Sequence, residues 1–326
     1  MNPNAKISKV PPPSCLLCGQ GGASIVDSIR TEDLAVAWRQ MGVRFTPEAW
    51  SVFKETPQVF RYNCNHCGFQ FFDSSLAGNA SFYAELQNQI QTYYPVSCPG
   101  FERAIRFALR HKLRSVLDIG CGSGGFLDLA KRAGLATTGI ELNQQAIDIC
   151  RKKGHRVFSC RLTDLEREIG PTRFDLITIF EVLEHVSDPV QLHSEAADRL
   201  SPSGYLAVTV PNRNGVHRLF EMNPHQWPPH HLSWWRRRDL KEIARRHNLE
   251  LVKLGGDLLL GAQIEHFVKV QSEILFALNK RRRPSGSKPL HLLVLGYRKC
   301  GCKFFFPRWG TSIYAFYRNR TSRSCS

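Results

Sequence analysis

The chain has 326 residues, 42% of them hydrophobic, so it can bury one full α/β core and still form a small additional module. The first thirteen residues are polar and rich in proline, and the apolar run at 290–295 is far too short to cross a bilayer. These features argue against a signal peptide and a transmembrane protein, and we expect a cytoplasmic one.

The formal net charge of +16 is concentrated towards the C-terminus. Residues 280–326 contain twelve Lys or Arg and no Asp or Glu, so this basic tail holds +12 of the total. A basic tail attracts polyanions, so RNA and, through peripheral contact, an acidic membrane surface are candidate partners. A solvated tail without a specific partner is the alternative.

Two matching CxxCG turns lie in the first 75 residues, and their cysteines are Cys15, Cys18, Cys64 and Cys67. Cysteine pairs in a reducing compartment are more often metal ligands than disulfides. Two such turns complete a tetrahedral Zn²⁺ site, and four thiolates leave no open position for catalysis. We therefore predict a zinc-ribbon-like module over residues 1–75, with a helix at 31–40 and a structural zinc.

A helical connector is expected over residues 76–112, ending in the amphipathic run 101–110. Strand-like and helix-like segments then alternate, which predicts an α/β domain with a parallel sheet covered by helices. The expected strands are 115–119, 136–141, 156–160, 174–180, 204–210, 249–254 and 312–317. The expected helices are 125–133, 145–153, 189–200 and 238–247. An inserted segment at about 256–310 should hold a further helix at 263–278 and several basic residues.

A glycine cluster, formed by Gly120, Gly122 and Gly125, lies at the first strand-to-helix turn of this domain. Glycine lets a ligand approach the main chain closely, but the GxGxxG spacing alone also describes a nicotinamide-binding fold. Glu141 ends the next strand, where a carboxylate can accept hydrogen bonds from both ribose hydroxyls. The loop could bind a nicotinamide dinucleotide or S-adenosylmethionine, and Asp118 distinguishes the two. Its negative charge favours the cationic end of S-adenosylmethionine and would repel a pyrophosphate.

Four segments, in this order, resemble the motifs of class I S-adenosylmethionine-dependent methyltransferases. They are VLDIGCGSG at 116–124, GIELN at 139–143, FDLITIFEVLEHVSDP at 174–189 and LSPSGYLAVTVPN at 200–212. The resemblance covers roughly 113–254, with weaker agreement at 310–318. It implies a methyltransferase domain over 113–326, built on a Rossmann-like seven-stranded sheet whose last strand is antiparallel.

The resemblance also implies which residues bind S-adenosylmethionine. The glycines at 120 and 122 would lie beside the methionine moiety, Glu141 on the ribose, and the turn at 180–182 near the cofactor. The adenine would be met around 160–164. The cofactor-binding residues expected in this way are Asp118, Gly120, Cys121, Gly122, Glu141, Leu142, Phe180 and Glu181.

A cluster of acids and histidines follows, which bears on catalysis. Methyl transfer from a sulfonium is an in-line displacement that often requires removal of a proton. In one interpretation, His185, His230 or His231 is the general base. In a second, Glu181, Glu184, His185 and His231 bind a divalent cation such as Mg²⁺, which activates a hydroxyl. In a third, Glu184 and His185 only fix the packing of the helix and loop.

Further resemblances concern the acceptor. The metal arrangement resembles that of small-RNA 2′-O-methyltransferases, and ExxEH recurs in ubiquinone-pathway O-methyltransferases. The CxxCG pairs, FYAELQ at 82–87 and PPHHLSWW at 228–235 together resemble bacterial methyltransferases of surface-polysaccharide or secondary-metabolite biosynthesis. These resemblances imply O-methylation of a sugar or other small biosynthetic intermediate, with a small molecule or glycan as acceptor. A metal-assisted RNA methyltransferase and a non-catalytic binding module are the alternatives.

Overall fold

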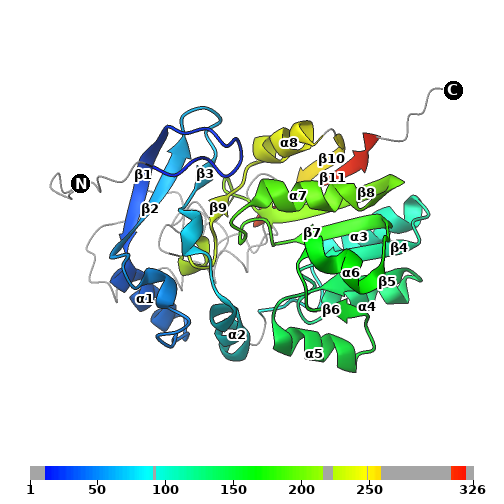
Figure 1. Ribbon diagram of the computed structural model, residues 1–326, viewed down its shortest axis with the longest axis horizontal. Coiled ribbons are helices and arrows are strands. Elements are labelled where there is room, and N and C mark those ends of the chain that lie inside the picture. Colours follow the sequence, from blue (N-terminus) through cyan, green and yellow to red (C-terminus); the bar gives the residue numbers. More distant parts are fainter. Residues whose placement is uncertain (1–11, 91–92, 216–222, 248, 258–309, 321–326) are drawn as a thin grey trace, which may run out of the picture.

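The computed structural model describes residues 12–90, 93–215, 223–247, 249–257 and 310–320. These residues form two sheets that lie beside one another, one of four strands and one of seven (Figure 1). No helix within these ranges is long and apolar enough to span a membrane. The helix expected at 263–278 and most of the basic tail lie outside the described residues.

The larger sheet has the strand order β10-β11-β8-β7-β4-β5-β6. Its strands are β4 (Ser115–Ile119), β5 (Ala136–Ile140), β6 (Val157–Phe158), β7 (Phe174–Phe180), β8 (Leu200–Pro211), β10 (Leu249–Gly256) and β11 (Ser312–Asn319). The strands from β8 to β6 pair in parallel, whereas β11 runs antiparallel to both β8 and β10. This confirms the predicted Rossmann-like sheet and its antiparallel last strand.

Helices cover both faces of this sheet (Figure 1). On β4, Val116 packs on the face of α3 and α4, and the next residue, Leu117, packs on the opposite face with α6, α7 and α8. Burial on both faces explains why β7 is an almost continuous apolar run. The helices are α3 (Pro99–Arg110), α4 (Gly125–Arg132), α5 (Gln144–Lys152), α6 (Leu165–Ile169), α7 (Pro189–Asp198) and α8 (Arg237–Arg246).

The smaller sheet has the order β1-β2-β3-β9 and belongs mainly to the N-terminal region. Its strands are β1 (Ala23–Arg30), β2 (Gln58–Cys64), β3 (Gln70–Phe71) and β9 (Ser233–Trp234), and α1 (Thr31–Gln40) packs beside it where the sequence predicts a helix. The fourth strand comes from the loop before α8, outside residues 1–75. The predicted domain boundaries therefore remain a prediction, and the N-terminal sheet is not built from the N-terminal segment alone.

The connector forms two helices, α2 (Ala80–Gln89) and α3, instead of one helical region. The chain between them passes over the glycine loop. A Cβ atom built on Gly122 would lie 2.4 Å from the ring of Tyr94, and one built on Gly125 would lie 2.3 Å from the carbonyl oxygen of Pro95. The non-helical part of the connector is therefore packed against the predicted cofactor loop.

Candidate active site

The glycine loop joins β4 to α4 at the carboxyl edge of the seven-stranded sheet. Gly120 and Gly122 have φ angles of +73° and +50°, a left-handed conformation that favours glycine. The amides of Gly120 and Cys121 donate to the carbonyl oxygen of Ile140 at 2.9 and 3.1 Å. These bonds tie the loop to the end of β5 and place Glu141 beside it.

The carboxylate of Glu141 is the main acceptor at this edge. Its Oε2 accepts a hydrogen bond from the amide of Gly122 at 2.9 Å, and its Oε1 accepts from the amides of Leu142 and Asn143 at 2.7 and 2.9 Å. A carboxylate offers about four acceptor positions, so one remains, and breaking the Gly122 bond would provide a second. Leu142 is 65% exposed beside it and presents an apolar surface to the solvent.

Two side chains cover the loop. The ring of Tyr94 lies over Gly122, and the Nδ2 of Asn143 donates to its hydroxyl at 3.4 Å. At the other glycine, a Cβ built on Gly120 would lie 2.6 Å from Cγ2 of Val182. A ligand that contacts the main chain at Gly122 therefore requires the Tyr94 ring to move.

Asp118 lies below the loop and is only 3% exposed. Its Oδ1 accepts a hydrogen bond from Oγ1 of Thr178 at 2.7 Å, which joins β4 to β7. Burial raises the pKa of Asp118 to about 7. A cation bound at the loop would favour the ionised carboxylate, as expected for the sulfonium end of the cofactor.

The turn after β7 has an unusual backbone. Glu181 has a φ angle of +54°, which is rare for a residue other than glycine, and its amide donates to the carbonyl oxygen of Thr209 at 2.8 Å. Phe180 packs against Phe101 and Phe126 with ring centroids 5.2 and 5.0 Å apart. Backbone strain of this kind clusters at functional sites, and this turn lies at the carboxyl edge where α/β sheets bind ligands.

The structure brings His185, His230 and His231 together. One ring nitrogen from each lies within 4.8 Å of the other two. Nδ1 of His185 lies 2.5 Å from the carbonyl oxygen of His230, and Nδ1 of His230 lies 3.0 Å from the carbonyl oxygen of His225. Because a carbonyl oxygen only accepts, both Nδ1 atoms are protonated, and Nε2 of His185 and of His230 are acceptors. The hydroxyl of Tyr93 lies 3.1 Å from Nε2 of His230 and donates to it.

Glu184 lies beside this cluster and is 1% exposed. Its Oε1 lies 3.6 Å from Nε2 of His185 and 4.0 Å from Nε2 of His231. Neither carboxyl oxygen has a hydrogen-bond partner among the described residues. Burial raises the pKa of Glu184 well above its usual range and lowers the pKa of His185 to about 4. A buried carboxyl group beside imidazoles whose Nδ1 atoms bind carbonyl oxygens fits a divalent cation. His230, which the sequence placed only among the candidate bases, joins this group.

The four cysteines of the CxxCG turns also converge. The Sγ atoms of Cys15 and Cys67 lie 3.7 Å apart, those of Cys18 and Cys64 lie 3.5 Å apart, and all four lie within 4.8 Å of one another. Zinc bound to four sulfurs at about 2.3 Å places those sulfurs about 3.8 Å apart, so the spacing fits zinc. None of the four forms a disulfide. The hydrogen bond between the two side chains lowers the pKa of Cys67 to about 5 and raises the pKa of Cys15, so without a metal one of the pair is a thiolate and the other a thiol.

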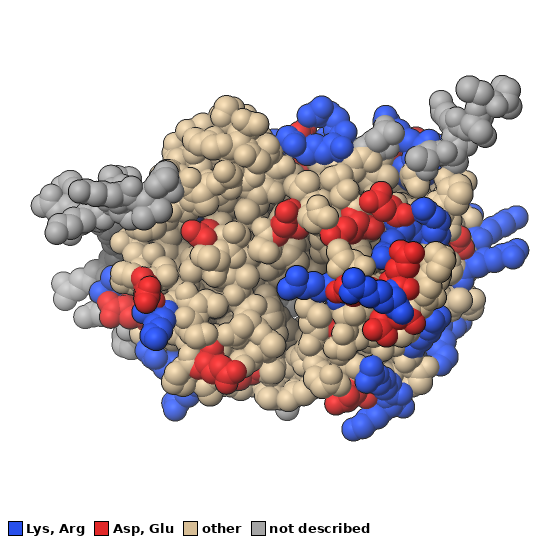
Figure 2. Space-filling model, in the orientation of Figure 1, with Lys and Arg blue, Asp and Glu red and all other residues tan. Residues whose placement is uncertain are grey.

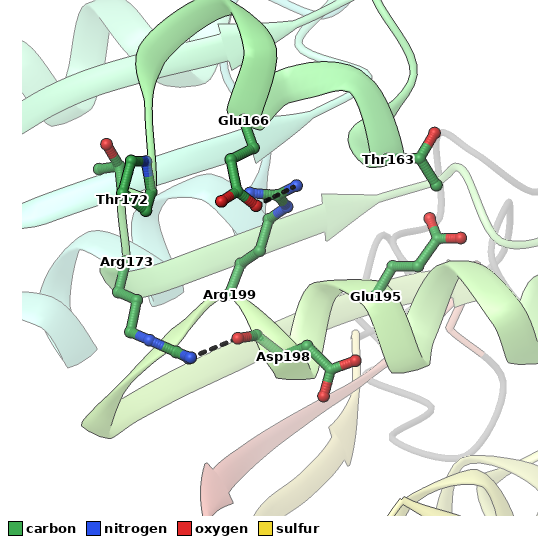
Figure 3. Close-up of a pocket in the computed structure, with 8 residues that line it drawn as sticks. Thr163, Glu166, Thr172, Arg173, Glu195, Asp198 and Arg199 are labelled. Carbon is green, nitrogen blue, oxygen red and sulfur yellow. Dashed lines mark hydrogen bonds and ion pairs between the residues drawn. The ribbon is translucent and has the colours of Figure 1, made fainter.

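A cavity of about 420 Å³ lies away from these groups (Figure 3). It is lined by Thr163, Glu166, Pro171, Thr172, Arg173, Glu195, Asp198 and Arg199. Arg173 and Arg199 directly precede β7 and β8, so the cavity lies at the amino edge of the sheet, opposite Glu141. Open α/β sheets bind their ligands at the carboxyl edge, and we therefore assign this cavity no part in the reaction.

The charged surface bears on the RNA alternative. On the face shown in Figure 2, Lys and Arg interleave with Asp and Glu over the seven-stranded sheet, charged groups of both signs gather near α1, and the surface over β1 and β2 is largely uncharged. The described residues on this face form no continuous basic surface of the kind that a nucleic-acid backbone requires. RNA binding therefore has no support from this face.

The strand order, the glycine loop and the acid after β5 define a class I S-adenosylmethionine-dependent methyltransferase fold. Comparison with known families agrees. Residues 93–254 match the family described as "Methyltransferase domain", and the chain contains a domain of this family.

Two curated relatives are both named ubiquinone biosynthesis O-methyltransferase. The protein from Idiomarina loihiensis is 31% identical over 106 residues, which make up 31% of this chain and 44% of the relative. The protein from Vibrio cholerae is 30% identical over 112 residues, 33% of this chain and 46% of the relative. The chain thus matches less than half the length of these relatives. A solved SAM dependent methyltransferase from Archaeoglobus fulgidus aligns with 20% identity and a TM-score of 0.44, over 67% of this chain and 94% of that one.

Proposed function

We propose that this protein transfers the methyl group of S-adenosylmethionine to a hydroxyl oxygen of a sugar or other small biosynthetic intermediate. The main support is the carboxylate of Glu141, held beside Gly122 at the carboxyl edge of a methyltransferase sheet. This arrangement offers a ribose one open acceptor position, and a second once the Gly122 bond breaks, beside a loop that the ring of Tyr94 covers. Both curated relatives are named O-methyltransferases, which supports oxygen as the accepting atom.

In this reaction the acceptor oxygen attacks the methyl carbon, the carbon–sulfur bond breaks, and the sulfur keeps the electron pair. The hydroxyl proton must also leave. Nε2 of His185 is an acceptor that can receive it, but a pKa of about 4 makes this imidazole a weak base at neutral pH. In the alternative, a metal makes the hydroxyl more acidic, Nε2 of His185 is one of the metal ligands, and solvent takes the proton.

A divalent cation would supply that acidity by Lewis-acid activation of the hydroxyl. His185, His230 and His231 would hold it, because one ring nitrogen from each converges, and Glu184 beside two of them would supply a carboxylate. Three imidazoles and one carboxylate suit Zn²⁺ or another transition metal better than Mg²⁺. We propose separately that the four cysteines bind a structural Zn²⁺.

Tritium-labelled methyl transfer tests the proposal. The full-length protein is incubated with labelled S-adenosylmethionine and host extract separated into small molecules, glycans and RNA. Label should enter the small-molecule or glycan fraction, and Gly120→Arg, which fills the loop, should abolish transfer. Transfer to RNA alone would contradict the proposed acceptor.

The choice between a metal and a base has its own test. Protein treated with a chelator that leaves the cysteine-bound zinc in place should lose activity and regain it with Zn²⁺, Fe²⁺ or Mn²⁺. Activity that persists without metal, with a pH–rate profile altered by His185→Gln, would favour the base.

A further inference from the structure

A second cavity, of about 520 Å³, lies between the carboxyl end of β8 and the amino end of α8. Four guanidinium groups and two side-chain amides line it, and no lining residue is acidic. The lining residues are Asn212, Arg213, Asn214, Arg236, Arg237 and Arg238. We refer to it below as the arginine cavity.

One carboxylate, that of Asp239, pairs with these arginines among the described residues. Nε and Nη2 of Arg236 donate to it at 2.8 and 2.7 Å, and Nε of Arg238 lies 3.9 Å away. Arg237 is exposed and forms no ion pair with a described residue. Burial, followed by the charge of Arg236, lowers the pKa of Arg213 to about 10. The cavity therefore has an excess of positive charge.

Main-chain contacts hold two of the arginines in place. Nη1 of Arg213 donates to the carbonyl oxygen of Gly68 at 3.4 Å, and Nη2 of Arg238 donates to that of Cys67 at 3.0 Å. A guanidinium has five N–H donors, so these contacts leave donors available to a ligand. Both arginines donate to carbonyl oxygens of the second CxxCG turn and not to its sulfurs. Neutralising the thiolate charges therefore does not by itself explain why the arginines lie here.

The cavity lies on the same edge of the sheet as the proposed reaction. Arg213 follows Thr209 by four residues, and the carbonyl oxygen of Thr209 accepts from the amide of Glu181. Four residues span at most about 14 Å, so the arginine cavity is within the length of one small molecule from the turn beside the cofactor loop. The segment 230–238 also runs directly from the histidine cluster to this cavity.

We propose that the arginine cavity binds the phosphate or diphosphate group of a small phosphorylated acceptor and thereby orients its hydroxyl towards the methyl donor. Guanidinium groups match phosphate oxygens in pairs, and the amino end of α8 adds partial positive charge. A cavity of this volume accommodates a small ligand, whereas a nucleic-acid chain requires an extended basic surface. This assignment of the acceptor class rests on the proposed methyltransferase function.

Calorimetric titration with inorganic pyrophosphate at fixed ionic strength tests the binding site. The full-length protein should bind one pyrophosphate. Arg237→Gln should weaken that binding about tenfold, the loss of one charge-assisted pair. Arg213→Lys keeps the charge but loses the planar fork and should also weaken it. Arg245→Gln is the matched control, because Arg245 lies at the far end of α8 and pairs with Glu242 at 2.9 Å. It should change the affinity less than twofold.

Several results would overturn the proposal: no saturable binding, equal affinity in Arg237→Gln, or an equal loss in Arg245→Gln. Single-stranded RNA that binds in place of pyrophosphate, and is lost in Arg237→Gln, would also overturn it. To test the acceptor itself, phosphatase and phosphodiesterase treatment of the extract should abolish methyl transfer, and an unaffected signal would refute a phosphorylated acceptor. A parallel titration with S-adenosylmethionine separates the two failures, since pyrophosphate binding without cofactor binding would refute the methyltransferase function, and with it the acceptor role, but not the anion site.

Discussion

Oε2 of Glu141 accepts a hydrogen bond from the amide of Gly122 at 2.9 Å, so a carboxylate after β5 and the loop after β4 meet across the carboxyl edge of the sheet. One acceptor position of the carboxylate is open to a ribose hydroxyl, and a second becomes available when the bond from the Gly122 amide breaks. Three main-chain amides orient the carboxylate before a ligand binds, whereas the Tyr94 ring over Gly122 must move to admit one.

This relationship predicts the effect of removing the charge. Glu141→Gln keeps the size of the side chain but replaces one acceptor oxygen with a donor, so we expect the Kd for S-adenosylmethionine to rise at least about tenfold. Calorimetry measures it directly. Glu102→Gln is the control, since Glu102 is an exposed residue of α3 and its loss should leave the affinity unchanged. Equal affinity of Glu141→Gln and the parent would contradict the assignment of the ribose contact.

The packing of Tyr94 on Gly122 predicts a coupled pair of substitutions. Gly122→Ala places a methyl group 2.4 Å from the Tyr94 ring and also strains a residue with φ of +50°. We expect the backbone strain alone to lower the free energy of unfolding by about 1–2 kcal/mol, and the clash with the ring to lower it further. Tyr94→Ala in the same chain should remove the clash but not the backbone strain, as measured by urea unfolding. Strictly additive effects in this double-mutant cycle would show that the two residues do not touch.

The cysteine cluster predicts a stoichiometric metal. Elemental analysis should find one zinc per chain bound by the four cysteines, and Cys64→Ser should release it. Loss of a structural zinc removes several kcal/mol of folding free energy, so the Tm should fall by about 10 °C. Cys160→Ser is the control, because Cys160 lies far along the chain beyond β6 and outside the cluster. A Cys64→Ser protein that keeps its zinc and its Tm would contradict the site.

Asp118 predicts a dependence of stability on pH. Its pKa is about 7 in the folded chain against 3.8 for an unperturbed aspartate, so between these values the folded state retains a proton that the unfolded state has lost. Its contribution to stability therefore falls as the pH rises from about 4 to about 7, by at most about 4 kcal/mol. Asp118→Asn should remove this fall, and urea unfolding at pH 5 and pH 8 without cofactor measures it. The reverse sign, with Asp118 stabilising the protein more at pH 8, would show that the carboxylate is ionised in the fold.

The sequence predicts those features whose signals are local. The strands β4 and β7 are short, mainly apolar runs bounded by turn residues, and the glycine loop between β4 and α4 requires positive φ angles. The antiparallel β11 is expected from the resemblance of the four ordered motifs to a known family and not from a local signal. The strands and the glycine loop each depend on residues close to one another in the chain.

Features that depend on distant pairing are not predictable in this way. β9 has only two residues, which is too short for a periodic sequence pattern. It pairs with β3 because the fold brings residues 233–234 beside residues 70–71. The cover of Tyr94 over Gly122 and the bond between His185 and His230 likewise join distant segments. The sequence gives no local signal of a cavity at the arginines of 236–238, because Arg213 joins them only in the folded chain.

The most direct test of this account is a calorimetric titration of the full-length protein with S-adenosylmethionine. We predict one binding site per chain, displacement by S-adenosylhomocysteine, no displacement by NADH, and no binding to Gly120→Arg. Undiminished binding to Gly120→Arg, or displacement of the ligand by NADH, would show that the crevice between the glycine loop and Glu141 serves a different ligand.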